Sequence, residues 1–180
     1  MTLLDFVNIF LAVGVVLSQF FILLAIVYIF LPFNKNIVSR FFSKNGISLA
    51  FIVSVLATTV SLFYSNYAGF EPCVLCWYQR IFMYPQVIIL GIALLKNNIE
   101  EERKIIDYSL ALSILGGVIS IYHNYIYFMG VHAKVCSATE SCITPYITEF
   151  GYITIPVMAL TGFALMSLLL IIKKIYDKKF

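Results

Sequence analysis

Long apolar runs separated by short polar segments make up most of this chain. About 20 helical residues cross the hydrocarbon core of a bilayer, so runs of this length predict membrane-spanning helices. We expect five of them, over residues 6–31, 47–66, 77–95, 106–129 and 153–172. The predicted fold class is all-α: a polytopic membrane helical bundle with antiparallel neighbours and short connections.

Composition supports this prediction, because 62% of the 180 residues are hydrophobic and only 12% are charged. About a quarter of the residues in soluble domains are charged, so no separate soluble domain is expected. The net charge of +3 does not indicate a nucleic-acid partner, and the expected surroundings are the lipid bilayer.

The first apolar run has no Lys or Arg before it and no clear cleavage site, so we expect a retained span rather than a signal peptide. Its polar residues, Asn8, Ser18 and Gln19, form no evident site. We therefore expect an anchoring or packing helix.

Basic residues mark one side of the predicted bundle. All but two of the 12 Lys and Arg residues fall in segments 34–45, 96–104 and 173–179. The positive-inside rule places these segments in the cytoplasm. With five crossings, the protein is expected in the cell membrane with its N-terminus outside and its C-terminus cytoplasmic. Segments 67–76 and 130–152 are then both extracytoplasmic.

The four cysteines all fall in or at the edge of these two outer segments. Cys73 and Cys76 belong to the first segment, and Cys136 and Cys142 belong to the second. The outer side of the membrane is oxidising, and disulfides persist there.

The C-x-x-C pair is expected at the start of a helix, because Pro72 precedes Cys73 and a long apolar run follows. Unpaired backbone N–H groups and the helix dipole favour a thiolate at that position. Arg80 follows Cys76 by one helical turn and lowers the pKa of that thiol further. An acidified dithiol suits thiol–disulfide exchange.

Other interpretations of these cysteines stay open on the residues alone. A lone C-x-x-C can be half a zinc site or a structural disulfide, and all four cysteines together could bind one zinc ion. Cys136 and Cys142, with five residues between them, could form a structural disulfide of the loop. Next to a second pair on the same membrane face, a relay of electrons by successive exchange is the better interpretation.

Two further residues are candidates for an acceptor site. Arg80 either extends to the lipid headgroups or stabilises the Cys76 thiolate and an anionic acceptor beside it. His123, near the outer end of the fourth span, either bonds a neighbouring helix or donates a hydrogen bond to a bound carbonyl compound.

The run Pro72-Cys73-Val74-Leu75-Cys76-Trp77-Tyr78-Gln79-Arg80 resembles the signature of the disulfide bond formation protein B (DsbB) family, and it is most similar to the BdbC-like branch. The Tyr-His in the fourth span and the segment 150–156 also fit. The resemblance covers residues 47–172. It divides the chain into an extra N-terminal transmembrane helix with a cytoplasmic linker, residues 1–46, and a DsbB-like four-helix membrane domain, residues 47–180.

The resemblance implies a protein-disulfide oxidoreductase of the quinone reductase type. Such a protein reoxidises an extracytoplasmic thioredoxin-like thiol oxidase (DsbA/BdbD-like) and passes electrons to membrane quinone, either ubiquinone or menaquinone, without metal or flavin. Carried over, Cys73 and Cys76 face the quinone and Cys76 reacts with it. Arg80 and His123 bind the quinone, and Cys136–Cys142 meets the partner. The alternative function is a membrane scaffold or transport component with structural disulfides in its outer loops.

Two departures from the family pattern are visible. The span over residues 6–31 is additional to the usual four, and the second cysteine pair is closely spaced. Lys134 makes Cys136 the better leaving group, which favours partner attack on Cys142, whereas the family's order favours attack on Cys136.

Overall fold

The computed structural model describes residues 3–30, 36–95, 99–130, 136, 142 and 146–177. Helices account for almost all of them, and this part of the chain contains no strand longer than the single bridge between Glu149 and Ile153. The elements, in order, are α1 (Leu3–Phe30), α2 (Asn36–Leu62), the π-helix η1 (Phe63–Tyr67), α3 (Val74–Leu95), α4 (Ile99–Met129) and α5 (Ile155–Asp177). The all-α prediction is confirmed.

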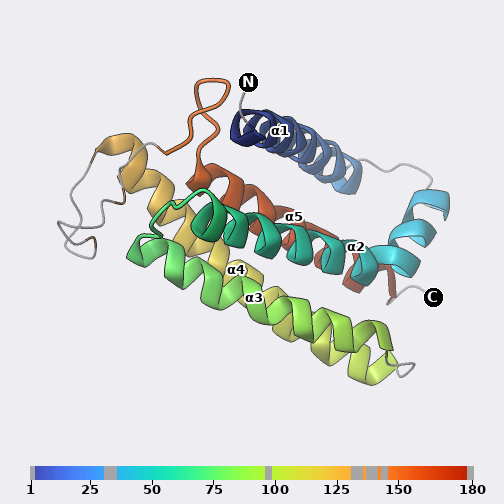
Figure 1. The fold of residues 1–180 in the computed structure, drawn as a ribbon. Helices are drawn as coiled ribbons and strands as arrows, with labels where there is room; N and C mark the ends of the chain where they lie inside the picture. Colours follow the sequence, from blue (N-terminus) through green and yellow to red (C-terminus); the bar gives the residue numbers. More distant parts are fainter. Residues whose placement is uncertain are drawn as a thin grey trace.

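Successive helices run in opposite directions along one bundle (Figure 1). Helix α2 packs on α3 and α5, and α4 packs on the same two helices, so α2 to α5 form a closed four-helix core. Helix α1 lies outside this core and packs along α5. The predicted arrangement of four helices plus one is therefore what the fold shows.

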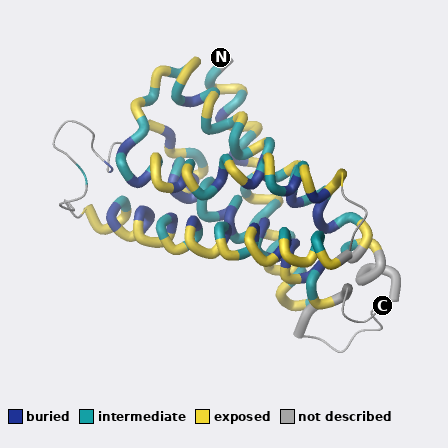
Figure 2. Tube along the Cα trace, turned by 90° about the horizontal axis from the view of Figure 1, so that it is seen from below, coloured by how far each residue is buried: buried dark blue, intermediate teal, exposed yellow. Residues whose placement is uncertain are grey.

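Five described helices are long and apolar enough to cross a membrane. Exposed residues follow the outward faces of the bundle (Figure 2), and many of them are large and apolar. The protein is thus a multi-pass membrane protein. Two helices begin well before the apolar runs, by about two turns or more: α2 at Asn36 and α4 at Ile99. Charged residues continue a helix readily outside the bilayer, and Glu100, Glu101 and Glu102 in the first turn of α4 complement its dipole.

The two cysteine-bearing segments lie at the same end of the bundle (Figure 1). The loop before α3 and the segment before α5 meet there, beside the N-terminal end of α1. The C-terminal ends of α1, α3 and α5 lie at the opposite end. This juxtaposition was expected from the sequence; which end faces the cytoplasm stays a prediction.

Close packing in the core depends on small and polar residues. Gly116 on α4 faces the ring of Phe163 on α5, and a Cβ atom on this glycine would lie 2.3 Å from ring carbons. Between α3 and α4, the buried amide oxygen of Gln86 accepts hydrogen bonds from Ser109 (2.8 Å) and Ser113 (3.0 Å). Small residues and interhelical hydrogen bonds of this kind are typical of helix association in membranes.

Helix α1 is attached to the core through polar side chains that suggested no site in the sequence. The Tyr64 hydroxyl of η1 donates to Asn8 Oδ1 at 3.0 Å in buried surroundings. Gln19 donates to Thr161 Oγ1 of α5 at 3.2 Å and accepts from the Tyr152 hydroxyl at 2.9 Å. These hydrogen bonds show how α1 packs against the four-helix core.

Candidate active site

Cys73 and Cys76 form a hydrogen-bonded dithiol at the start of α3. Cys73 is the last residue before the helix, and its carbonyl accepts the N–H of Trp77 at 3.1 Å. The two sulfur atoms lie 3.0 Å apart, and both thiols are free. The Cys76 backbone N–H also points at the Cys73 sulfur, at 3.4 Å. The predicted position of the pair at a helix N-terminus is confirmed.

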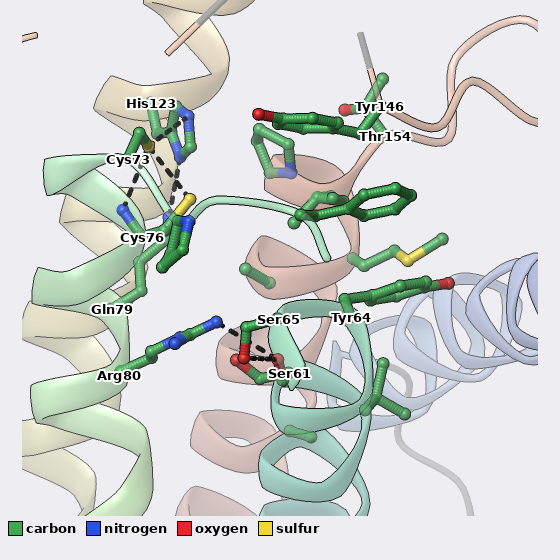
Figure 3. Close-up of a pocket in the computed structure, with 18 of the residues that line it drawn as sticks. Ser61, Tyr64, Ser65, Cys73, Cys76, Gln79, Arg80, His123, Tyr146 and Thr154 are labelled. Carbon is green, nitrogen blue, oxygen red and sulfur yellow. Dashed lines mark hydrogen bonds between the residues drawn. The ribbon is translucent and has the colours of Figure 1, made fainter. Parts of the chain in front are cut away.

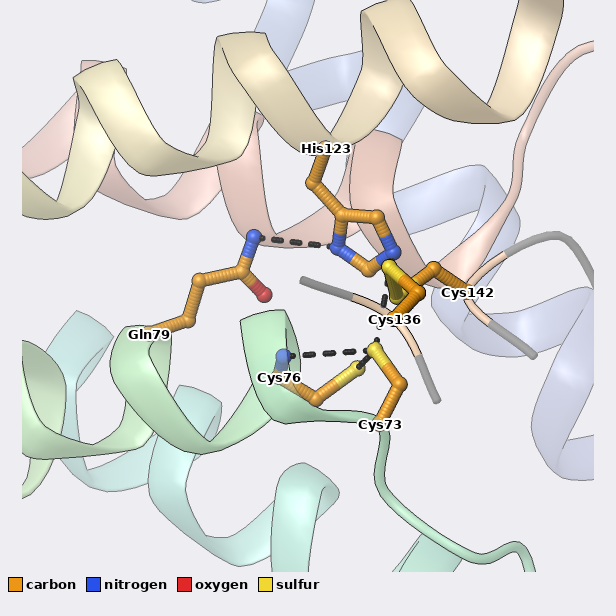
Figure 4. The surroundings of a disulfide bond; sticks show 6 residues. All are labelled: Cys73, Cys76, Gln79, His123, Cys136 and Cys142. Carbon is orange, nitrogen blue, oxygen red and sulfur yellow. Dashed lines mark hydrogen bonds between the residues drawn. A yellow bond between two sulfur atoms is a disulfide. The ribbon is translucent and has the colours of Figure 1, made fainter. Parts of the chain in front are cut away.

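His123 reaches this dithiol from α4. Its Nε2 lies 3.8 Å from the Cys73 sulfur, and its Nδ1 lies 3.4 Å from the Gln79 amide nitrogen (Figure 4). Both His123 and Gln79 are buried. The sequence pointed to His123 but missed Gln79. The available signal was spacing, because Gln79 follows Cys76 by three residues and so shares its helix face.

The environment of Cys73 favours the thiolate. The pKa of Cys73 is lowered from 9.0 to about 4. The largest cause is the hydrogen bond with the Cys76 thiol; burial opposes it, and the contact with His123 adds to the lowering. From the sequence we expected the thiolate on Cys76, because Arg80 shares its face. The contacts favour Cys73 instead, because the backbone N–H of Cys76 donates to the Cys73 sulfur and Nε2 of His123 lies 3.8 Å from it.

Arg80 points into the bundle and links α3 to α2. Its Nη2 donates to the Ser61 carbonyl at 3.2 Å, and its guanidinium carbon lies 5.2 Å from the centre of the Trp77 ring. The Ser61 carbonyl lies just before the π-helix η1, and π-helical turns are frequent at functional sites. The structure thus holds a positive charge one turn below Cys76.

Cys136 and Cys142 form a disulfide with a Cα–Cα distance of 5.9 Å. Cys142 is buried in one apolar cluster with Cys73, and Cys136 packs against that cluster but is less buried (Figure 4). The structure thus brings all four predicted cysteines together. A four-cysteine zinc site is not formed, because the sulfur atoms of a disulfide are not thiolate ligands. Lys134 lies outside the described residues.

The ligand atoms of Cys73, Cys76 and His123 all lie within 4.8 Å of one another. Three nitrogen and sulfur ligands with an open position are the donor set of some catalytic zinc sites, so these residues could hold such an ion. The same three groups also form a thiol pair with an adjacent imidazole, an arrangement that can carry out thiol–disulfide exchange without a metal.

A cavity of about 170 Å³ opens beside the dithiol. Helices α2, α3, α4 and α5 and η1 all contribute to its wall (Figure 3). The wall is mostly apolar and aromatic, with a few polar or charged side chains: Ser61, Ser65, Glu71, Gln79, Arg80, His123 and Thr154. An apolar cavity with a few convergent polar groups is the usual form of a small-molecule site. Of these groups, the sequence pointed only to Arg80 and His123.

Thiol–disulfide exchange requires a thiolate close to a disulfide, and this end of the bundle provides both. The fold and the site together define a membrane disulfide oxidoreductase. Comparison with known proteins gives the family: residues 43–173 match the profile described as disulfide bond formation protein DsbB. The chain belongs to this family.

Relatives from several bacilli agree with the family assignment. Probable disulfide formation protein C 1 of Bacillus cereus is 46% identical over 112 residues, which cover 61% of this chain and 78% of the relative. SPbeta prophage-derived disulfide bond formation protein B of Bacillus subtilis is 43% identical, over 72% of this chain and 88% of the relative. Disulfide bond formation protein C of Bacillus subtilis is 39% identical, over 69% of this chain and 89% of the relative. No solved structure matches the chain.

These relatives support the BdbC-like branch that the signature around Cys73 indicated. The family match covers α3 and α4 and most of α2 and α5, and it does not include α1. The division of the chain at residue 46 and the catalytic roles of individual residues stay predictions.

Proposed function

We propose that the protein reoxidises an extracytoplasmic thioredoxin-like disulfide oxidase and passes two electrons to a membrane quinone. The observation that carries this proposal is the position of the Cys73–Cys76 dithiol. On one side it shares a buried cluster with the Cys136–Cys142 disulfide, and on the other it borders an apolar cavity at the outer part of the helices. A carrier between a protein substrate and a lipid-soluble acceptor needs both neighbours.

The partner's thiolate attacks Cys136, since Cys136 is less buried than Cys142. The Cys136–Cys142 bond breaks, and Cys142 leaves as a thiolate within the cluster that contains Cys73. The partner's second thiol then displaces Cys136, and the partner leaves as an oxidised protein. The partner has lost two electrons, and the loop pair has gained them.

The loop dithiol passes these electrons to the inner pair. Cys142 attacks the Cys73–Cys76 disulfide at Cys73, and Cys136 then resolves the mixed disulfide. This restores the Cys136–Cys142 bond and leaves Cys73 and Cys76 reduced. The structure has this combination of redox states, with the loop pair bonded and the inner pair free.

The inner dithiol then reduces the quinone. The Cys73 thiolate and the Cys76 thiol lose two electrons and one proton and form a disulfide. The quinone gains two electrons and two protons and becomes a hydroquinone, and its second proton is the one that Cys73 gave up when its thiolate formed. His123 is placed to accept a proton at Nε2, because this atom lies 3.8 Å from the Cys73 sulfur. Arg80 supplies a fixed positive charge in the cavity wall, which favours electron transfer to an acceptor that becomes more negative.

The proposed orientation follows from the basic residues. Lys173 and Lys174 lie near the C-terminal end of α5, opposite the cysteines. The positive-inside rule makes that end cytoplasmic, so the dithiol faces the oxidising side of the cell membrane.

The test is quinone reduction by the purified protein, with a reduced thioredoxin-like C-x-x-C protein as donor and ubiquinone or menaquinone as acceptor. We expect turnover in the native protein and none in Cys76→Ser, whose remaining cysteine cannot form the inner disulfide. Absence of turnover with both quinones, together with cysteines that resist mild reductant, would instead support a scaffold with structural disulfides.

A further inference from the structure

The hydroxyl group of Thr154 has no hydrogen-bond partner among the described residues, although its side chain is buried with 1% exposure. Thr154 is the residue before α5, and its carbonyl accepts the N–H of Met158 at 2.9 Å. It therefore occupies the N-cap position. A threonine there normally accepts an N–H from the second or third helical residue. The second is Pro156, which has no N–H, and the hydroxyl is not used as a cap.

Thr154, which carries this unpaired hydroxyl, borders the cavity. Thr154 is one of its lining residues, and Figure 3 places it on the α5 side, across from Cys76 and Arg80 on α3. A buried hydroxyl without a partner costs free energy, so such a group in a native structure calls for an explanation. A ligand in the cavity would supply the missing partner.

Three other polar groups in the same wall already have partners within the protein. The Tyr64 hydroxyl donates to Asn8, Arg80 donates to the Ser61 carbonyl, and His123 contacts Cys73 and Gln79. Thr154 has a hydroxyl that can donate to a ligand without breaking a contact within the protein.

We propose that the Thr154 hydroxyl donates a hydrogen bond to a carbonyl oxygen of the bound quinone, which makes Thr154 a binding residue of the acceptor site. This inference rests on the function proposed above. The ring then spans the cavity from α5 toward Cys76. As the inner pair gives two electrons and forms its disulfide, negative charge grows on the carbonyl oxygens before two protons arrive. The bond from Thr154 strengthens with that charge, and the adjacent N-terminus of α5 favours it.

The chain offers a matched control in Thr58 of α2. Its Oγ1 is also buried and has no partner in the described structure. Thr58 is not a lining residue of the cavity. Replacement of either threonine by valine removes one unpaired hydroxyl at nearly constant volume, but only Thr154→Val removes it from the cavity.

The experiment compares the full-length protein with Thr154→Val, Thr154→Ser and Thr58→Val. The KM for quinone is measured with a saturating reduced donor protein, and quinone affinity is measured separately by quenching of Trp77, the single tryptophan of the chain. We expect Thr154→Val to raise both the KM and the Kd about tenfold, as for the loss of one hydrogen bond to a ligand. Thr154→Ser keeps the hydroxyl, so its KM and Kd should stay near the native values. Thr58→Val should also leave both values unchanged, because it removes a hydroxyl outside the cavity. Exchange with the donor in the absence of quinone is unchanged in all three.

Native KM and Kd values in Thr154→Val would overturn the inference, and so would an equal loss in Thr58→Val. If Thr154→Val does not fold, Thr154→Ala removes the same hydroxyl without adding a methyl group, and the same outcomes decide. Failure of the proposed function is a different result, because the native protein itself would then neither bind nor reduce quinone.

Discussion

The Cys73 sulfur and Nε2 of His123 lie 3.8 Å apart, although 50 positions separate these residues in the chain. Helix α4 brings the imidazole to the N-terminus of α3, where the dithiol begins. A proton acceptor therefore lies next to the sulfur that the contacts favour as a thiolate. The proton that leaves the Cys73 thiol therefore has a neighbouring group that can take it up.

The pH dependence of Cys73 follows from its hydrogen bonds. Because the pKa of Cys73 is lowered to about 4, the thiolate is present above that pH and is lost below it. We expect thiolate absorbance of the reduced inner pair, in a Cys136→Ser/Cys142→Ser background, to change with a midpoint near 4 and to stay constant from pH 5 to neutrality. Cys76→Ala removes the main donor and moves the midpoint up toward 9.0, and His123→Ala moves it up by less. A midpoint that Cys76→Ala leaves unchanged would contradict this assignment.

Arg80 is expected to act on quinone reduction and not on exchange with the partner. Its guanidinium lies in the cavity wall, bonded to the Ser61 carbonyl. Arg80→Met removes the charge, and we expect quinone reduction to slow by about tenfold or more while exchange stays nearly native. Arg80→Lys keeps the charge and should lose less. Stopped-flow measurement of the two half-reactions separates these effects, and equal loss in both would refute the division of roles.

The buried bond between Tyr64 and Asn8 is expected to stabilise the attachment of α1. A double-mutant cycle with Tyr64→Phe and Asn8→Ala should give a coupling free energy of about 0.6 kcal/mol, as is typical of hydrogen bonds between membrane helices. The readout is unfolding in mixed micelles. Ser18→Ala is the control, because the Ser18 hydroxyl bonds the Gly14 carbonyl of its own helix. Additive effects of the two substitutions would show that the bond contributes nothing.

The close approach of α4 and α5 can be tested at two neighbouring glycines. A Cβ atom at Gly116 would lie 2.3 Å from ring carbons of Phe163, whereas one at Gly117 would meet that residue only at 3.8 Å. We expect Gly116→Ala to lower the free energy of unfolding by about 1–3 kcal/mol, since overpacking forces the ring to move. Gly117→Ala should be nearly neutral. Similar thermal stability of the two variants would contradict this packing.

Much of the fold could be predicted from the sequence, because the length of apolar runs is a direct consequence of bilayer thickness. The same reasoning located the ends of α2 and α4 poorly. Charged residues outside the bilayer carry no hydropathy signal, yet Asn36 and Ile99 begin helices well before the apolar runs. In α4, three glutamates of the first turn complement the helix dipole, a contribution that hydropathy does not register.

The candidate site could be predicted only where residue chemistry is local. Cys73, Cys76 and Arg80 stand in one short run, and His123 was a recognisable exception in an apolar span. Thr154 could not be found in this way. A threonine before a helix is ordinarily a cap, and only the packing of five elements around the cavity shows that its hydroxyl is left without a partner.

The most direct measurement follows the electrons through the two cysteine pairs. Fully oxidised protein is mixed with a reduced thioredoxin-like donor in the absence of quinone, and free thiols are alkylated and located by mass spectrometry. We predict that Cys73 and Cys76 become labelled while Cys136 and Cys142 stay bonded, and that added quinone removes the label. Labelling of Cys136 and Cys142 with a persistent Cys73–Cys76 bond would contradict an inner pair that carries electrons from the partner to the acceptor.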